Sequence, residues 1–189
     1  MGNEFVSGDG MKGIVFNLLE EVVLRQYGPE TWDDLLDGAG AAGSYTSLGN
    51  YSDEEMQKLV ATAATALNLT PAEVLRWFGQ QAMPLLAERY PHFFDQHDSA
   101  RNFILSVNSI IHPEVRKLYA GANCPLFHFR EEGDGTLMMG YRSSRKLCDL
   151  AHGFVQGAAA HYREQVAIEH LSCMQRGDKQ CLVEIRWRQ

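Results

Sequence analysis

The sequence predicts an α+β protein in which helices come first and a small antiparallel sheet follows. Roughly the first two-thirds carries apolar residues at three- and four-residue spacing, which is typical of amphipathic helices. In the last third, apolar and polar residues alternate on both sides of two turn signals. One more helical stretch separates the two hairpins that this alternation predicts.

The composition indicates a globular protein. The chain has 189 residues, of which 45% are hydrophobic and 22% charged. A net charge of -7 without any Lys/Arg cluster argues against a nucleic-acid partner. No run reaches the roughly 18 apolar residues of a membrane helix. Residues 1–10 lack the apolar core of a secretory signal.

We therefore expect a cytoplasmic protein that does not enter a membrane, with its cysteines reduced. We also expect residues 1–10 to be a disordered start or a cloning remnant. The folded chain then begins at Met11.

The first helix is expected over residues 12–27, and Gly28 with Pro29 ends it. Residues 38–51 are rich in Gly, Ala and Ser and predict a loop.

Two capping-box patterns predict where the next two helices begin. Ser52 is followed by Glu55 three residues later, and Thr70 by Glu73. Within the second of these helices, Pro84 should end or kink the helix.

A further helix can be capped by Asp98 or Ser99, and we expect Pro113 to interrupt it directly after His112.

The first predicted hairpin joins residues 126–130 to 136–141 through a Glu-Gly-Asp-Gly turn. Residues 145–162 return to a helical pattern. The second hairpin joins residues 165–171 to 180–187 across an Arg-Gly-Asp turn.

The most informative motif is the triplet Tyr141, Ser143 and Arg145. If this stretch is extended, all three side chains leave one face over roughly 13 Å. Two hydroxyls and a guanidinium suit a ligand with two neighbouring carboxylates, such as the propionates of haem. Haem iron takes a histidine as axial ligand, and His112 precedes the triplet. Each pattern alone is more typical of a packing histidine or a solvated strand face, so only their combination indicates haem.

A second group of candidate ligands is Cys148, His170, Cys173 and Cys181. Three thiolates and one imidazole suit tetrahedral zinc. The spacing equally allows an alternative, in which buried thiols act as small hydrophobic groups. Cys124 stands apart and is interpreted as a packing residue.

The sequence resembles the haem-nitric oxide/oxygen binding (H-NOX) family, sensor modules related to the haem domain of soluble guanylate cyclase. The resemblance extends from Met11 to the C-terminus and is carried by Met11-Lys12-Gly13, Tyr27-Gly28, His112, Pro125 and Tyr141-x-Ser143-x-Arg145. It implies one domain over residues 11–189. In that domain a helical N-terminal lobe packs on a C-terminal lobe with a small antiparallel sheet, and haem b lies between them.

By resemblance, His112 is the proximal iron ligand and Pro125 presses on the porphyrin. Tyr141, Ser143 and Arg145 would hold the propionates.

The resemblance also raises the case for zinc, because a subset of stand-alone bacterial members carries the set Cys148, His170, Cys173 and Cys181 as a zinc site. With four protein ligands, no position stays open for an activated water, so a zinc hydrolase is not expected.

Alignment to the family predicts a distal wall without a hydrogen-bond donor. Oxygen-binding members use a distal tyrosine, and this chain has Leu150 where that tyrosine would fall. The other wall positions are also without a donor: Val15, Leu19, Ala82, Leu86 and Phe154. Bound dioxygen is held better by a donor. We therefore expect a nitric oxide sensor that excludes oxygen.

The predicted function is a non-catalytic nitric oxide sensor with a five-coordinate ferrous haem. Because 189 residues leave no room for an output domain, we expect a separate effector. The family implies a histidine kinase or a cyclic-di-GMP enzyme. The alternative is a zinc/cysteine thiol redox sensor that regulates the same kind of effector. A peroxidase-type enzyme is disfavoured because the aligned distal positions offer no acid or base.

Overall fold

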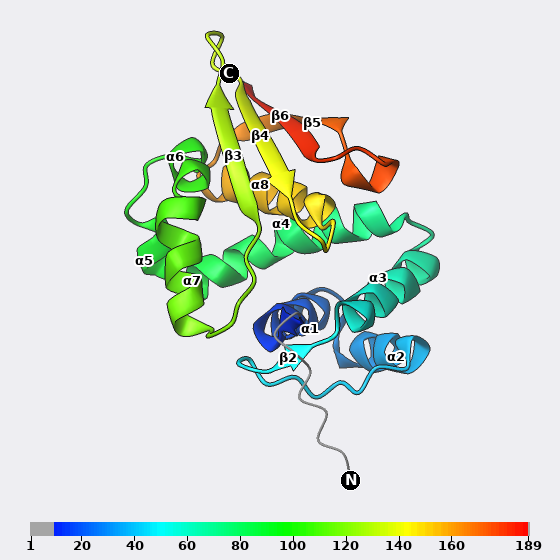
Figure 1. The fold of residues 1–189 in the computed structure, drawn as a ribbon. Helices are drawn as coiled ribbons and strands as arrows, with labels where there is room; N and C mark the ends of the chain where they lie inside the picture. Colours follow the sequence, from blue (N-terminus) through cyan, green and yellow to red (C-terminus); the bar gives the residue numbers. More distant parts are fainter. Residues whose placement is uncertain (1–9, 189) are drawn as a thin grey trace. The chain divides into compact units, whose positions relative to one another are not determined.

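The computed structural model describes residues 10–188 and confirms the predicted α+β fold. The expected disordered start lies outside the described residues, apart from Gly10. The chain divides into two compact units (Figure 1). Unit 1 comprises Met1–Val74 and Val115–Asn123, and unit 2 comprises Leu75–Glu114 and Cys124–Gln189. Across residues 10–188, every helix is too short or too polar to span a membrane.

Unit 1 is built from helices around a two-stranded ribbon. Its elements are β1 (Met11–Lys12), α1 (Gly13–Tyr27), α2 (Pro29–Ala39), β2 (Asn50–Tyr51) and α3 (Asp53–Leu67). Helix α2 packs against both α1 and α3. The sequence pattern did not predict α2, whose buried side is narrow and consists of Trp32 and Leu35.

The loop between α2 and α3 is held by aromatic rings. Tyr45 stacks on Phe16 at 4.4 Å between centroids, and Tyr51 meets Phe16 edge-on at 5.5 Å. The Tyr45 hydroxyl donates to Glu55 Oε1 at 2.7 Å. Burial and this hydrogen bond raise the pKa of Tyr45. The predicted loop is therefore irregular in backbone but tightly packed.

Both predicted capping boxes set helix starts. Ser52 Oγ accepts from the Glu55 amide at 3.2 Å. Thr70 Oγ1 accepts from the Glu73 amide at 3.2 Å, and Glu73 accepts in return from the Thr70 amide at 2.7 Å. Helix α4 (Pro71–Arg89) continues through Pro84 rather than ending there. Burial of apolar residues on both sides of the exposed proline stabilises the two halves of this helix together.

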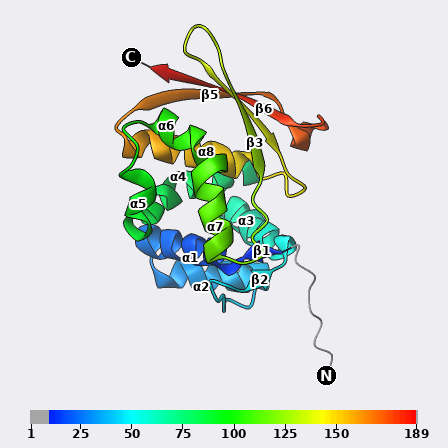
Figure 2. The ribbon, with the colours of Figure 1, turned by 60° about the vertical axis from the view of Figure 1, so that its left-hand side comes forward.

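Unit 2 contains a four-stranded antiparallel sheet in the order β3-β4-β6-β5, and both predicted hairpins are correct. The strands are β3 (Leu126–Glu131), β4 (Leu137–Arg142), β5 (Gln165–Ser172) and β6 (Cys181–Arg188). The helices α6 (Ala100–Leu105) and α8 (Cys148–His161) lie along one face of the sheet (Figure 2). Two short helices, α5 (Pro91–Phe94) and η2 (Met174–Arg176), complete the unit's periphery.

Helices α4 and α8 cross at glycines that permit very close approach. A Cβ atom at Gly153 would lie 2.1 Å from the Arg76 carbonyl oxygen. One at Gly79 would lie 2.5 Å from the Leu150 carbonyl oxygen. No other residue type fits at this crossing without separating the helices.

The helix around His112 differs from the prediction. Helix α6 ends at Leu105, a π-helical turn η1 (Val107–Ile111) follows, and α7 (His112–Leu118) begins at His112. Pro113 therefore lies in the first turn of α7, directly after the π-helical turn, and the helical backbone continues through it. The expectation that Pro113 interrupts a helix was wrong.

Candidate functional site

His112 faces an aromatic residue of the sheet. Its ring lies 5.8 Å from the ring of Phe127, at 31° between the planes, and its Nδ1 atom is buried. Phe127 belongs to β3, and its ring lies 5.5 Å from that of Tyr141 on β4. Phe127 thus joins the predicted iron ligand to the first residue of the triplet.

Tyr141 is the most buried residue of the triplet, with 2% of its surface exposed. In the sheet it lies opposite Phe127 on one side and Cys181 on the other. Its hydroxyl accepts from the Leu147 amide at 3.0 Å and is hydrogen-bonded to the Ser143 side chain. Burial raises the pKa of Tyr141, so the phenol is protonated and available as a hydrogen-bond donor at neutral pH.

Ser143 and Arg145 do not continue the strand, so the expectation of one extended face was wrong. Strand β4 ends at Arg142, and the Lys146 amide donates to the Ser143 carbonyl at 3.2 Å, closing a turn. The Arg145 amide donates to Ser143 Oγ at 3.3 Å. The triplet is therefore a strand end and the turn after it, held together through Ser143.

These residues fit a haem. The imidazole of His112 can ligate iron, and the guanidinium of Arg145 with the hydroxyls of Tyr141 and Ser143 can bind two carboxylates. All four side chains are at least half-buried and belong to unit 2. Pro125 is half-buried and stands two residues before Phe127, immediately before β3 begins.

The predicted distal residues lie on three helices. Val15 and Leu19 are on α1 in unit 1, and the others are on α4 and α8 in unit 2. In unit 2, Leu86 and Phe154 pack against the main apolar cluster, Ala82 is fully buried and Leu150 is 8% exposed. None of these side chains carries a hydrogen-bond donor.

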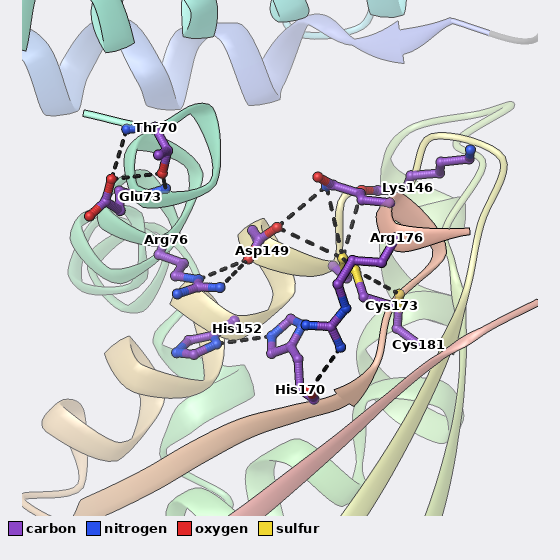
Figure 3. A network of polar contacts seen from close by, with 12 residues as sticks. Thr70, Glu73, Arg76, Lys146, Asp149, His152, His170, Cys173, Arg176 and Cys181 are labelled. Atoms are coloured by element: carbon purple, nitrogen blue, oxygen red, sulfur yellow. Dashed lines mark hydrogen bonds and ion pairs between the residues drawn. The ribbon is translucent and has the colours of Figure 1, made fainter. Parts of the chain in front are cut away.

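The three cysteines predicted as zinc ligands meet in the core of unit 2 (Figure 3). The Sγ atoms of Cys148 and Cys173 are 3.5 Å apart, and those of Cys173 and Cys181 are 3.9 Å apart. Thiolates around tetrahedral zinc lie roughly 3.8 Å from one another, given a Zn–S bond near 2.3 Å. Burial raises the pKa of Cys148 and of Cys181, so a bound cation would have to displace their protons. Tyr141 packs in the same cluster.

His170, the fourth predicted zinc ligand, has a different partner in the structure. Its Nε2 atom lies 3.0 Å from Nδ1 of His152. Within residues 10–188, only the three thiols among the four predicted ligands lie within 4.8 Å of one another. His152 is not among the ligands that the sequence predicted. Burial lowers the pKa of His152 to about 4, so this imidazole is neutral at pH 7.

A buried carboxylate beside the thiols was missed by the sequence analysis. Asp149 is 3% exposed, and its Oδ1 accepts from Arg76 Nε at 2.8 Å and from Arg76 Nη2 at 2.7 Å (Figure 3). Gln175 Nε2 donates to the other carboxylate oxygen of Asp149 at 3.3 Å. Asp149 therefore ties α4 to α8 and to the turn that carries Cys173. Arg76 and Asp149 are 73 residues apart, so no local pattern could have paired them.

Comparison with known proteins gives one consistent result. The haem-NO-binding family, HNOB, matches residues 12–170. Soluble guanylate cyclase gcy-32 of Caenorhabditis elegans is 26% identical over 164 residues, covering 79% of this chain and 23% of the cyclase. The chain thus spans about a quarter of the length of the curated cyclases that it matches.

Among solved structures, an H-NOX protein from Shewanella oneidensis in the Fe(II)NO ligation state is 32% identical, with a TM-score of 0.89. The match covers 95% of this chain and 100% of that protein. An unliganded Fe(II) H-NOX protein from K. algicida has the same fold, with a TM-score of 0.81 at 23% identity, over 95% of this chain and 97% of that one. With the family pattern matching most of its length, the chain belongs to the haem-NO-binding family.

Proposed function

We propose that residues 11–189 form one haem-binding domain that senses nitric oxide, with His112 as the axial ligand. Tyr141, Ser143 and Arg145 would hold the propionates of haem b. The observation that carries the proposal is the packing of Phe127 against both the His112 ring and the Tyr141 ring. It brings the proposed iron ligand and the proposed carboxylate-binding residues into one part of unit 2.

His112 would hold the haem through its iron, and the haem would supply a site that binds nitric oxide and whose bond to His112 changes when the gas binds. His112 is the first residue of α7, and the division between the two units falls inside this helix, after Glu114. A change in the position of His112 therefore acts on a helix to which both units contribute residues.

The domain is proposed to be non-catalytic and cytoplasmic, and to pass its signal to a separate protein. The family resemblance favours a histidine kinase or a cyclic-di-GMP enzyme as that effector. Selectivity for nitric oxide over oxygen follows from the side chains aligned to the distal wall, of which Leu150 takes the place of a donating tyrosine.

Absorption spectra of the reduced protein test this proposal, recorded without gas, in air and with nitric oxide. We expect a five-coordinate ferrous spectrum that air leaves unchanged and nitric oxide shifts. His112→Ala should abolish the histidine-ligated spectrum. His128→Ala, at an exposed histidine of β3, is the matched control and should retain it. A stable complex in air would contradict the argument from Leu150.

The thiol cluster supports a second candidate function, a zinc/cysteine redox sensor. Its support is the approach of three buried sulfur atoms to within 4.8 Å of one another. Metal analysis should then find one zinc per chain, lost in Cys173→Ser and retained in Cys124→Ser. His170→Ala should also lose zinc if His170 leaves His152 and becomes the fourth ligand, and should keep zinc if it does not. His112→Ala removes the proposed iron ligand. If oxidation of the cysteines in this variant still releases zinc and still changes the activity of the effector, this candidate is favoured over the haem sensor.

A further inference from the structure

Asn108 lies one turn before His112 and is bound to the sheet by both ends of its side-chain amide. Its Nδ2 donates to the Phe127 carbonyl at 2.6 Å, and its Oδ1 accepts from the Phe127 amide at 3.3 Å. Phe127 is the same residue whose ring faces the His112 imidazole at 5.8 Å. Phe127 therefore contacts two side chains of the η1–α7 segment. Asn108 binds its backbone, and the His112 ring faces its ring.

The position of Phe127 in the sheet explains why its backbone groups are available. Strand β3 is at the edge of the sheet, and β4 lies on its other side. Phe127 is directly opposite Tyr141. Because its amide and carbonyl bond to Asn108, the two residues form a non-hydrogen-bonded pair, in which side chains approach most closely. The Asn108 amide thus substitutes for a neighbouring strand at this point of the edge.

The turn that contains Asn108 is π-helical. The Ser106 carbonyl accepts from the amides of Ser109, Ile110 and Ile111 at 3.2, 2.8 and 3.3 Å. The amide of His112 donates to the Val107 carbonyl, five residues back. A π-helical turn contains one residue more than an α-helical turn and is rarely stable by itself. Its two bonds to Phe127 give this turn a partner outside the helix.

We propose that Asn108 is a positioning residue for His112. By binding the π-helical turn to β3, it sets the direction from which the His112 imidazole approaches the iron and keeps the ring against Phe127. The inference rests on the proposed function, in which His112 ligates haem iron. It goes further because it identifies η1 as the end of the helical segment that is fixed to the sheet. A displacement of His112 would then move α7 rather than η1.

The test compares Asn108→Ala with Ser109→Ala, in reduced, haem-loaded protein. Ser109 is exposed, lies in the same turn and bonds only within it at 3.4 Å to the Ser106 carbonyl, among the contacts described. Resonance Raman spectroscopy measures the iron–histidine stretching frequency, which a purely structural role would leave unchanged. We expect a lower frequency in Asn108→Ala and histidine release after nitric oxide addition that is about two- to tenfold faster. That range corresponds to the loss of about one net hydrogen bond. Ser109→Ala should match the wild type.

Asn108→Asp is the second variant, and it keeps the shape and the acceptor while removing the donor to the Phe127 carbonyl. It should shift the frequency in the same direction as Asn108→Ala. Hydrogen exchange of residues 110–114, followed by mass spectrometry with and without haem, should be faster in both Asn108 variants than in Ser109→Ala.

Two outcomes separate the inference from the proposed function. If wild type shows the iron–histidine band, His112→Ala loses it, and both Asn108 variants equal wild type in frequency and release rate, the inference is overturned while the function holds. If His112→Ala retains the band, the proposed function fails and the inference fails with it.

Discussion

Phe127 contacts both parts of the candidate haem site, although no motif marks it. Its ring meets the rings of His112 and Tyr141, and its backbone binds Asn108. The sequence predicted the hairpin that places residue 127 opposite residue 141, so the signal was present in the register of that hairpin. A phenylalanine in an alternating strand is ordinary core material, and this is why the pattern alone did not single it out.

Removal of the Tyr141 hydroxyl should weaken both the fold and haem retention. In Tyr141→Phe the Leu147 amide loses its acceptor at 3.0 Å, and an unsatisfied buried donor costs about 1–3 kcal/mol. We expect a lower midpoint of chemical denaturation and faster transfer of haem to apomyoglobin. Ser144→Ala, at an exposed hydroxyl in the same turn, should change neither quantity. Equal haem transfer from both variants would remove Tyr141 from the propionate site.

At the scale of secondary-structure elements, the sequence predicted those features that depend on neighbouring residues. Ser52 and Thr70 cap helices because their partners are three residues away. Both hairpins follow from turn residues and alternation. The details differ, because β4 is buried over five consecutive residues and the β5–β6 pairing shifts register between His170 and Ser172.

Elements that depend on distant contacts could not be predicted in this way. The π-helical turn η1 is bound to a residue 19 positions away, through Asn108. The pair His152 and His170 spans 18 positions, from a helix to a strand. In sequence, the stretch that contains η1 has the apolar spacing of an ordinary helix, and this spacing predicts a helix that ends at Pro113. Three of the four predicted zinc ligands meet because β6 and η2 bring them together, which the spacing did suggest.

The crossing of α4 and α8 should tolerate no side chain at Gly153. In Gly153→Ala the new Cβ would lie 2.1 Å from the Arg76 carbonyl, so the helices must separate. Overpacking of this kind costs about 1–3 kcal/mol, and we expect the free energy of unfolding to fall by that amount. Gly133→Ala is the control, since its Cβ would meet nothing within 4 Å. A chemical denaturation series measures both, and equal stabilities would contradict the close packing described.

At the scale of the whole molecule, charge is divided unequally between the two units. Unit 1 contains 12 of the 24 acidic residues and 5 of the 17 basic ones, whereas unit 2 contains 12 of each. The whole net charge of -7 therefore belongs to unit 1. Long-range repulsion of an anionic partner such as nucleic acid comes from this unit, and added salt screens it.

Two half-buried phenols, one in each unit, should make the stability of the protein fall at alkaline pH. Tyr162 donates to the Phe94 carbonyl at 2.9 Å in unit 2, and Tyr45 donates to Glu55 in unit 1. Burial, followed by the charges of Asp95 and Glu164, raises the pKa of Tyr162 to about 12. Burial is also the main cause of the raised pKa of Tyr45.

A phenol in the unfolded chain loses its proton near pH 10, whereas the folded protein holds these protons to higher pH. The unfolded state therefore binds fewer protons in this range, and stability falls as pH rises. We expect a melting temperature that is maintained below about pH 10 and decreases from there toward pH 12, through the folded pKa of Tyr162.

Tyr162→Phe should melt at a lower temperature than wild type at neutral pH, because the Phe94 carbonyl loses its donor. Its melting temperature should nevertheless fall less between pH 10 and 12. Tyr27→Phe, at a tyrosine that is 49% exposed, serves as the control and should follow the wild-type curve. If Tyr162→Phe and wild type lose melting temperature in parallel above pH 10, burial of this phenol does not determine the alkaline limit.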